Sequence, residues 1–435
     1  MRGGFGVFFG GFENQNGNNQ GNSYPFQFNF AYFIPDSHTP ITVSNVNAPG
    51  CNVAYTFELG FSCTPLDPAL VDASGIGWTG LQYNFQTPYT EGWNFTFEYA
   101  FTPSLTLTAG YVGNSTHHLE IFKGANNVTQ ILPPDATTCG PGAPIAFPDL
   151  GCSITYQTTD GNSHYNGLQT SLEKRFTGGL SFLTTYTFSR CRSDAGDLLN
   201  STAIGSYRAV DIPGVGIQAD YGDCDFDIRH VFHFSGGYQL PFGKGRHFLN
   251  GAGRGLDLLV GGWSTNWIAT IEGGQPITLP CDTSPAAGVG CNDFIIPGVN
   301  RHGSGAPDHF LNPAAFTQPC PPPGFQQPAT CVAGLSGLAL LGGPPTQVSG
   351  PGIGRWDFSL FKDIPLTERF RLQFRSEFFN ILNHPTFNAP GFGGNGVRAL
   401  PGSTDFLDAN FGRIGSTRFP FNDPRQIQFA LKLYF

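Results

Sequence analysis

The sequence predicts an all-β protein, an antiparallel transmembrane β-barrel of about ten strands with short periplasmic turns and long external loops. Three observations predict this fold. Apolar and polar residues alternate in many separate stretches, and a period of two places them on opposite faces of a strand. The connections between these stretches are alternately short and long. Aromatic residues make up 14% of the chain and charged residues only 12%, which suits strands with one lipid-facing side.

The C-terminal stretch, residues 425–435, shows the alternation over its whole length. Ile427, Phe429, Leu431, Leu433 and Phe435 fall on one parity, and Gln426, Gln428, Ala430 and Lys432 fall on the other, with Tyr434 beside them. Residues 369–381 repeat the pattern with Arg371, Arg375 and Glu377 on the polar parity. A wet lumen tolerates such charges, whereas Arg or Lys at the membrane midplane costs about 2–4 kcal/mol.

The other predicted strands follow from the same pattern. In order they are residues 2–12, a short extended piece at 25–33, and then 89–101, 105–113, 163–176, 180–190, 227–240, 261–279 and 356–364. Short turns are predicted at Thr102–Ser104, Thr177–Gly179, Pro241–Arg246 and Pro365–Glu368. If the C-terminal strand ends on the periplasmic side, counting back places all four turns there. The long connections, such as residues 114–162 and 280–355, are then external.

Ten cysteines form five neighbouring pairs along the chain. The pairs are Cys51 and Cys63, Cys139 and Cys152, Cys191 and Cys224, Cys281 and Cys291, and Cys320 and Cys331. Each pair encloses turn-forming residues, so five local disulfides are the simplest connectivity, although sequence alone does not fix it. The predicted topology places all ten on the external side. Persistent disulfides indicate an oxidising compartment such as the periplasm or the cell surface.

Composition excludes several other classes of protein. The longest apolar run, near Gly334–Gly343, falls well short of the ~20 residues that a membrane-spanning helix needs. The net charge of −9 argues against nucleic acid as a partner. Met1 is followed at once by a strand-like segment without the layout of an export signal, so we expect the N-terminus to be incomplete.

The densest acidic cluster comprises Asp220, Asp223, Asp225 and Asp227, with Cys224 and His230 close by. Calcium prefers several carboxylate oxygens, but the spacing is not that of an EF-hand loop. A solvated acidic loop end is therefore the preferred interpretation.

The other candidate histidine and glutamate side chains are expected to have structural and not catalytic or metal-binding roles. Adjacent His117 and His118, and His230 and His233, are expected on opposite faces of strands. Glu173 and Glu377 are expected to face the lumen as parts of a polar wall. The sequence has no GxSxG and no HExxH motif, which mark two common classes of hydrolase. We therefore predict no catalytic, cofactor or metal site and no enzymatic activity.

Several segments resemble a known family. They are Arg2–Gly11, Pro88–Leu119, Tyr165–Arg190, Asp227–Arg246, Gly354–Gly391 and the terminal RQIQFALKLYF. In this order they resemble the C-terminal barrel of Oar-like TonB-dependent receptors, and FRSEFFNILNHPTF is the most specific of them. The resemblance implies a barrel in the outer membrane of a Gram-negative-type bacterium, in contact with its lipid, within a protein that uses TonB energy for uptake.

The sequence also departs from that family. Its members begin with a signal peptide, usually a carboxypeptidase-regulatory-like β-sandwich, and then a plug domain, none of which lies in residues 1–435. The segment that engages TonB belongs to that missing part, and a full barrel has about 22 strands. We therefore expect residues 1–435 to be a partial receptor barrel that leaves unpaired edges at residues 2–12 and 425–435. Because open edges are not tolerated in lipid, the chain alone should aggregate unless these edges pair.

Two alternatives stay open at this point. The chain could be a small stand-alone barrel of about ten strands, serving as an outer-membrane porin or surface adhesin, because an even strand number permits closure. A secreted disulfide-rich β-sandwich would instead be soluble without detergent. The transported ligand is not identified by the sequence, and carbohydrate, siderophore and peptide all remain candidates.

Overall fold

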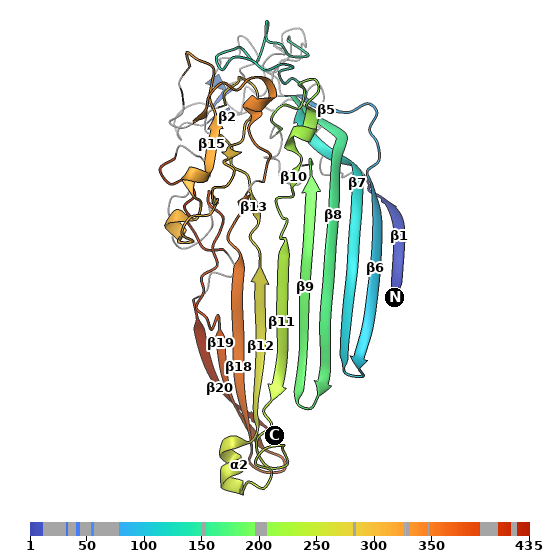
Figure 1. The fold of residues 1–435 in the computed structure, drawn as a ribbon, viewed down its shortest axis with the longest axis vertical. Helices are drawn as coiled ribbons and strands as arrows, with labels where there is room; N and C mark the ends of the chain where they lie inside the picture. The colour runs from blue at the N-terminus through green and yellow to red at the C-terminus, as the bar shows by residue number, and fades with distance from the viewer. Residues whose placement is uncertain are drawn as a thin grey trace.

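A tall antiparallel sheet dominates the computed structural model (Figure 1). The structure describes residues 1–11, 32–33, 41–43, 54–55, 78–148, 154–195, 207–281, 284–325, 327, 331–346, 348–391, 408–418 and 424–435. The long connections gather at one end of the sheet, here called the long-loop end, and the C-terminus lies at the other, the short-turn end. Among the described helices, none is long and apolar enough to cross a bilayer.

Ten strands form the main path of this sheet. They are β1 (Arg2–Phe9), β6 (Tyr89–Thr102), β7 (Leu105–Gly124), β8 (Ile154–Thr177), β9 (Leu180–Ser193), β11 (His230–Gln239), β12 (Trp263–Glu272), β18 (Ile353–Pro365), β19 (Arg371–Phe379) and β20 (Gln426–Tyr434). Each pairs antiparallel with the next in this order. Two short strands extend the sheet, since β5 (Trp78–Leu81) pairs with β8 and β10 (Gly222–Asp223) pairs with β9. The predicted all-β antiparallel fold is confirmed.

The register of the ladders places the apolar parities of the strands on one common face, here called the apolar face. Residues directly opposite each other in neighbouring strands share a face. One such row is Ile427, Phe378, Phe358 and Trp267, across β20, β19, β18 and β12. Another is Phe188, Leu168, Tyr111 and Phe95, across β9, β8, β7 and β6. The alternation seen in each strand is therefore a property of the whole sheet.

The apolar face is exposed and lacks a protein partner in the described part of the chain. On β20, Phe429 and Leu431 are each 65% exposed. Exposing this surface to water would cost free energy, because each Å² of apolar area that is removed from water stabilises a protein by roughly 25 cal/mol. Hydrocarbon removes that cost, so the face is built for a lipid environment.

The opposite, polar face carries Thr, Ser, Asn, Gln and charged side chains. Across β8, β7 and β6 it presents Gln169, Gly110 and Thr96. Across β20, β19 and β18 it presents Gln428, Glu377 and Ser359. Glu173 and Glu377 both belong to this face by register, which agrees with the predicted polar wall.

Two-residue turns close two of the hairpins at the short-turn end. Between β8 and β9, Gly178 and Gly179 have φ values of 62° and 85°. A two-residue turn with both φ values positive matches the twist of a hairpin, and glycine adopts it without steric cost. The predicted turn at Thr177–Gly179 is therefore present at this position.

The connection between β11 and β12 was wrongly predicted as a short turn at Pro241–Arg246. The chain between Gln239 and Trp263 instead contains the helix α2 (Arg254–Val260). Lys362 of β18 donates to the carbonyl oxygens of Leu259 and Gly261 and so fastens this helix to the sheet. A seven-residue helix is too short to show a helical period in sequence.

The hairpin of β7 and β8 extends further than predicted. Residues 114–162 were expected to form a long loop, but β7 continues to Gly124 and β8 begins at Ile154. Two register shifts follow His117 and Leu119, so the extended part does not keep a strict period of two. Its buried Glu120 accepts a hydrogen bond from Gln157 at 2.6 Å.

The long-loop end has apolar cores of its own. One cluster includes Leu279, Leu311, Phe316, Val348 and Phe411, and another includes Val128, Leu132, Ile212, Leu340 and Leu341. Short elements support them: β13 (Pro276–Ile277), β14 (Phe294–Ile295), β15 (Phe316–Pro319), β16 (Cys331–Val332), β17 (Val348–Ser349) and the 3₁₀ helices η5 (Gly216–Asp220), η6 (Pro307–His309), η7 (Pro313–Ala315) and η8 (Gly337–Leu341). Three further short strands, β2 (Tyr32–Phe33), β3 (Ile41–Val43) and β4 (Ala54–Tyr55), form a separate sheet. The rest of the extended piece predicted at 25–33 lies outside the described residues.

The sheet is open at both sides. In the described residues β1 pairs only with β6 and β20 pairs only with β19, so these two strands are its edges. Figure 1 shows them at the two ends of the strand order. A closed ten-stranded barrel would require a ladder between β1 and β20, which the strand order does not contain.

Candidate functional site

The predicted acidic cluster is part of an ion-pair network at the long-loop end. Asp223 of β10 lies 2.8 Å from Arg190, 2.8 Å from Arg229 and 3.9 Å from Arg192. Asp227 lies 3.5 Å from Arg229. The aspartates were predicted as a cluster, but these arginines were not predicted as its partners, although Arg190 and Arg192 flank Cys191 at the end of a predicted strand.

Asp227 is the most buried carboxylate of this network. Its side chain is 3% exposed, and it accepts a hydrogen bond of 2.9 Å from the backbone N–H of Cys191. Burial raises the pKa of Asp227 above its ordinary value, against the opposing effects of this hydrogen bond and of Arg229. The disulfide between Cys191 and Cys224 fixes the chain on either side of the network.

The remaining members of the cluster lie elsewhere. Asp220 pairs with Arg208 at 2.8 Å, and Asp225 is exposed between β10 and β11. His230 forms a 2.9 Å hydrogen bond with the hydroxyl of Tyr186. Asp220, Asp223 and Asp227 therefore pair with arginines, and the four aspartates of the cluster do not converge on one point. Within the described residues, no three His, Cys, Asp or Glu side chains are arranged to hold a metal ion.

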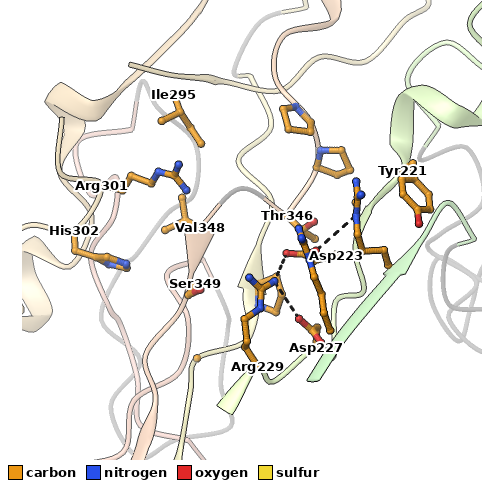
Figure 2. Close-up of a pocket in the computed structure, with 17 residues that line it drawn as sticks. Tyr221, Asp223, Asp227, Arg229, Ile295, Arg301, His302, Thr346, Val348 and Ser349 are labelled. Carbon is orange, nitrogen blue, oxygen red and sulfur yellow. Dashed lines mark hydrogen bonds and ion pairs between the residues drawn. The ribbon is translucent and has the colours of Figure 1, made fainter. Parts of the chain in front are cut away.

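A cavity of about 400 Å³ adjoins this network (Figure 2). Besides the five charged residues of the network, its lining includes Tyr221, Gly222, Gly274, Pro276, Ile295, Arg301, His302, Pro344, Pro345, Thr346, Val348 and Ser349. Figure 2 shows Arg301 and His302 across the cavity from Asp223 and Tyr221. Four arginines and two aspartates give the lining a positive balance. No sequence pattern joins residues 190–229 to residues 274–349, so sequence reasoning did not find this cavity.

A second group of charged side chains lies on the polar face of β18, β19 and β20. Arg355 lies 3.1 Å from Asp357, and Arg371 lies 3.7 Å from Asp363. Arg375 donates to the hydroxyl of Tyr434 at 3.1 Å. The first pair lies within β18, whereas the other two join β19 to its neighbours β18 and β20. All three lie on the side away from the apolar face, where the wall of a wet lumen tolerates charge.

The adjacent histidines depart from their predicted arrangement. His117 and His118 were expected on opposite faces, but both rings lie against Tyr89, with centroids 5.2 and 5.7 Å away. The cause is the bulge that follows His117, where His118 has a φ of 58°. A bulge adds one residue and re-aims the side chains beside it, so the strict alternation fails here.

Three of the five predicted cysteine pairs are disulfide-bonded in the structure. They are Cys191–Cys224, Cys281–Cys291 and Cys320–Cys331. Cys139 is also disulfide-bonded, whereas Cys51, Cys63 and Cys152 lie outside the described residues, so their pairing stays a prediction. The seven described cysteines all lie at the long-loop end, as the topology predicted.

A tall antiparallel sheet with one apolar face and one charged polar face is the wall of a transmembrane β-barrel. The family described as the outer membrane β-barrel domain matches residues 1–428. The chain therefore belongs to this family, and its place is the cell outer membrane. In such barrels the short turns are periplasmic and the long loops external, so the arginine cavity lies at the external end.

Solved outer-membrane proteins show a distant likeness. The chain is 9% identical to the outer membrane transporter YddB from Escherichia coli, with a TM-score of 0.38, over 82% of this chain and 34% of that one. It is 11% identical to the ferric-catecholate import receptor Fiu from E. coli K12, with a TM-score of 0.34, over 81% of this chain and 28% of that one. It is 9% identical to the FrpB iron transporter from Neisseria meningitidis, with a TM-score of 0.32, over 82% of this chain and 33% of that one.

The chain thus spans about a third of the length of these solved structures. At such TM-scores the likeness carries no argument about function. No curated protein matches the sequence.

Proposed function

We propose that this chain forms the C-terminal barrel portion of an Oar-like TonB-dependent receptor for uptake of a ligand across the outer membrane. The observation that carries the proposal is the open sheet of ten strands, whose two edges, β1 and β20, are unpaired in the described residues. An open edge in hydrocarbon leaves unsatisfied backbone groups, each costing several kcal/mol. Further strands that pair with both edges remove this cost.

The division of the sheet into faces supports the same proposal. The apolar face meets lipid, and the polar face lines a lumen wide enough for a plug or a ligand. The external end carries the long, disulfide-linked connections that ligand contact requires. We assign no enzymatic activity to the chain, and we expect contact with the TonB complex only through a segment that precedes these strands.

The ligand belongs to one of three classes, namely carbohydrate, siderophore or peptide. A porin or adhesin barrel of ten strands is the alternative. It predicts that β1 and β20 pair with each other, and the strand order of the described residues does not contain that pair.

One experiment separates the two functions. Residues 1–435 alone are expressed, refolded in detergent and examined by size-exclusion chromatography and in planar bilayers. The receptor proposal predicts aggregation, because both edges stay open, and no steady conductance. A monodisperse monomer with a stable conductance would establish a small closed barrel and overturn the receptor proposal.

A companion experiment addresses the longer protein. Sequencing the genomic DNA upstream of Met1 shows whether the reading frame continues into further strands and a plug. Continuation supports the receptor. A stop codon directly before a ribosome-binding site at Met1 contradicts it.

A further inference from the structure

The character of the apolar face changes at one level of β9. From Leu180 to Phe188 this face of β9 carries no charged residue, and the next two positions on the same face are Arg190 and Arg192. Positions two residues apart are about 6.6 Å apart along a strand. The guanidinium groups therefore lie just beyond the apolar band, on the side that faces the membrane.

Neighbouring strands change character at the same level. Arg192 lies opposite His164 of β8, and the His164 ring packs near those of His117 and Tyr221, with centroid distances of 6.2 and 6.5 Å. His117 in turn contacts Tyr89. Tyrosine rings such as those of Tyr89 and Tyr221 collect where hydrocarbon meets the headgroups. The arginines thus stand at the level of the outer-leaflet headgroups.

The cavity of about 400 Å³ opens from this level of the sheet into the external loops. Asp223 accepts hydrogen bonds from Arg190 and Arg229 at 2.8 Å each and lies 3.9 Å from Arg192. The Nε atoms of Arg192 and Arg229 are buried and have no hydrogen-bond partner. Buried donors without a partner cost free energy, and an acceptor bound in the cavity would remove that cost.

We propose that this cavity binds the phosphate group of a lipid headgroup from the outer leaflet. Arginine is suited to the task because its planar fork binds phosphate oxygens with two parallel hydrogen bonds. Arg192 also stacks over Tyr221, with its guanidinium carbon 4.3 Å from the ring centroid, which holds the fork in position. Arg301 adds positive charge from the opposite wall. This inference depends only on the membership of the outer-membrane family and not on the proposed uptake function.

The test uses the protein as its gene encodes it, with any segment that precedes Met1, purified from outer membranes in a mild detergent. The probe is short-chain phosphatidic acid, whose headgroup is a bare phosphate monoester, compared with phosphatidylcholine of the same chain length. Native mass spectrometry measures the lipid bound. Inorganic phosphate is added in a parallel series as the soluble source of the same chemistry.

Arg192→Gln is the informative variant. The Arg192 side chain lies 3.9 Å from Asp223, the longest ion-pair distance of the network, so its replacement disturbs the network least. Arg301→Gln, on a loop outside the sheet, is the second. The matched control is Arg175→Gln, an exposed arginine at the short-turn end that pairs only loosely with Glu173, at 3.7 Å.

Phosphatidic acid should bind in preference to phosphatidylcholine, and inorganic phosphate should not displace it. We expect each cavity variant to bind on the order of tenfold more weakly, the loss expected from one charge-assisted hydrogen bond, with Arg175→Gln unchanged. Equal losses in the control would show unspecific charge attraction and overturn the proposal. Displacement by inorganic phosphate would show a site for soluble anions, which also overturns it.

Discussion

The ten-stranded sheet and the long-loop end bury their apolar side chains in different places. Every buried apolar side chain among the described residues belongs to the long-loop end or to the adjoining ends of strands, such as Ile121 of β7 and Ile353 of β18. The membrane-spanning parts of the sheet expose their apolar side chains instead, such as Phe95, Phe188 and Phe429. One region carries its own core, and the other uses lipid in place of one.

This difference shows that two solvents act on one chain. At the long-loop end, apolar clusters and disulfides stabilise loops in water, where unsupported loops would have no core. In the sheet, ladder hydrogen bonds satisfy the backbone, and the hydrocarbon covers the apolar face. At the long-loop end, loss of a buried apolar side chain should therefore destabilise the protein. In the sheet, a charge on the exposed apolar face should do so.

The largest effect is expected from Phe316→Ala in the external core. Phe316 is 2% exposed, and its ring packs 5.7 Å from that of Phe411 in a T-shaped contact. Truncating a buried phenylalanine costs about 3–5 kcal/mol. We expect the external loops to become protease-sensitive while the sheet keeps its heat-modifiable migration on gels. The control is Phe226→Ala, which removes a 72% exposed ring at the same end and should leave protection intact.

The next largest effect is expected from Leu431→Arg on the apolar face of β20. Leu431 lies near the middle of the strand and is 65% exposed to the lipid side. An arginine near the midplane costs about 2–4 kcal/mol, so assembly into outer membranes should fall sharply. The control, Gln428→Arg, places the same charge on the polar face opposite Glu377 and should assemble normally. Equal losses for both variants would mean that the faces are wrongly assigned.

The sequence predicted the sheet well because a strand of a barrel wall has lipid on one side and water on the other. That condition imposes a strict period of two, which is visible in residues 89–101 and 425–435 without any tertiary information. The prediction failed where the period is broken for a local reason. The bulge after His117 hid the upper half of the β7–β8 hairpin, and the short helix α2 replaced the predicted turn at Pro241–Arg246.

The cavity lay beyond prediction for a different reason. Its walls come from β9, β10 and several separate segments between residues 274 and 349, and only the folded loops bring Arg192 and Thr346 to one space. The sequence did locate the aspartates, because they cluster along the chain. It did not reveal that Asp223 neutralises arginines, since ion-pair partners carry no fixed spacing.

Removal of a disulfide should have a smaller effect than loss of a core phenylalanine. Cys281→Ser with Cys291→Ser opens a bridge that joins residues only ten apart, beside the core that contains Leu279. Bridges of this kind stabilise by about 2–4 kcal/mol. We expect faster proteolysis of the external loops and unchanged assembly of the sheet. Reducing agent, which also opens the other disulfides, should reproduce the change at the 281–291 loop in the wild type and cause no further change at this loop in the variant.

The smallest effect is expected from the pH dependence of Asp227, which tests how closely the arginine network is tied to the fold. Burial raises the pKa of this carboxyl above its ordinary value of 3.8, so the folded chain holds the proton more tightly than the unfolded chain. The stabilising contribution is therefore complete below pH 3.8 and is lost as pH rises through the raised pKa. Asp227→Asn removes the titrating group but keeps an acceptor for the N–H of Cys191. The thermal midpoint of the protein as its gene encodes it, measured in detergent relative to the same protein with this substitution, should fall as the pH rises. An opposite slope would mean that Arg229 and the N–H of Cys191 outweigh burial, and that the network is held together by the ionised carboxylate.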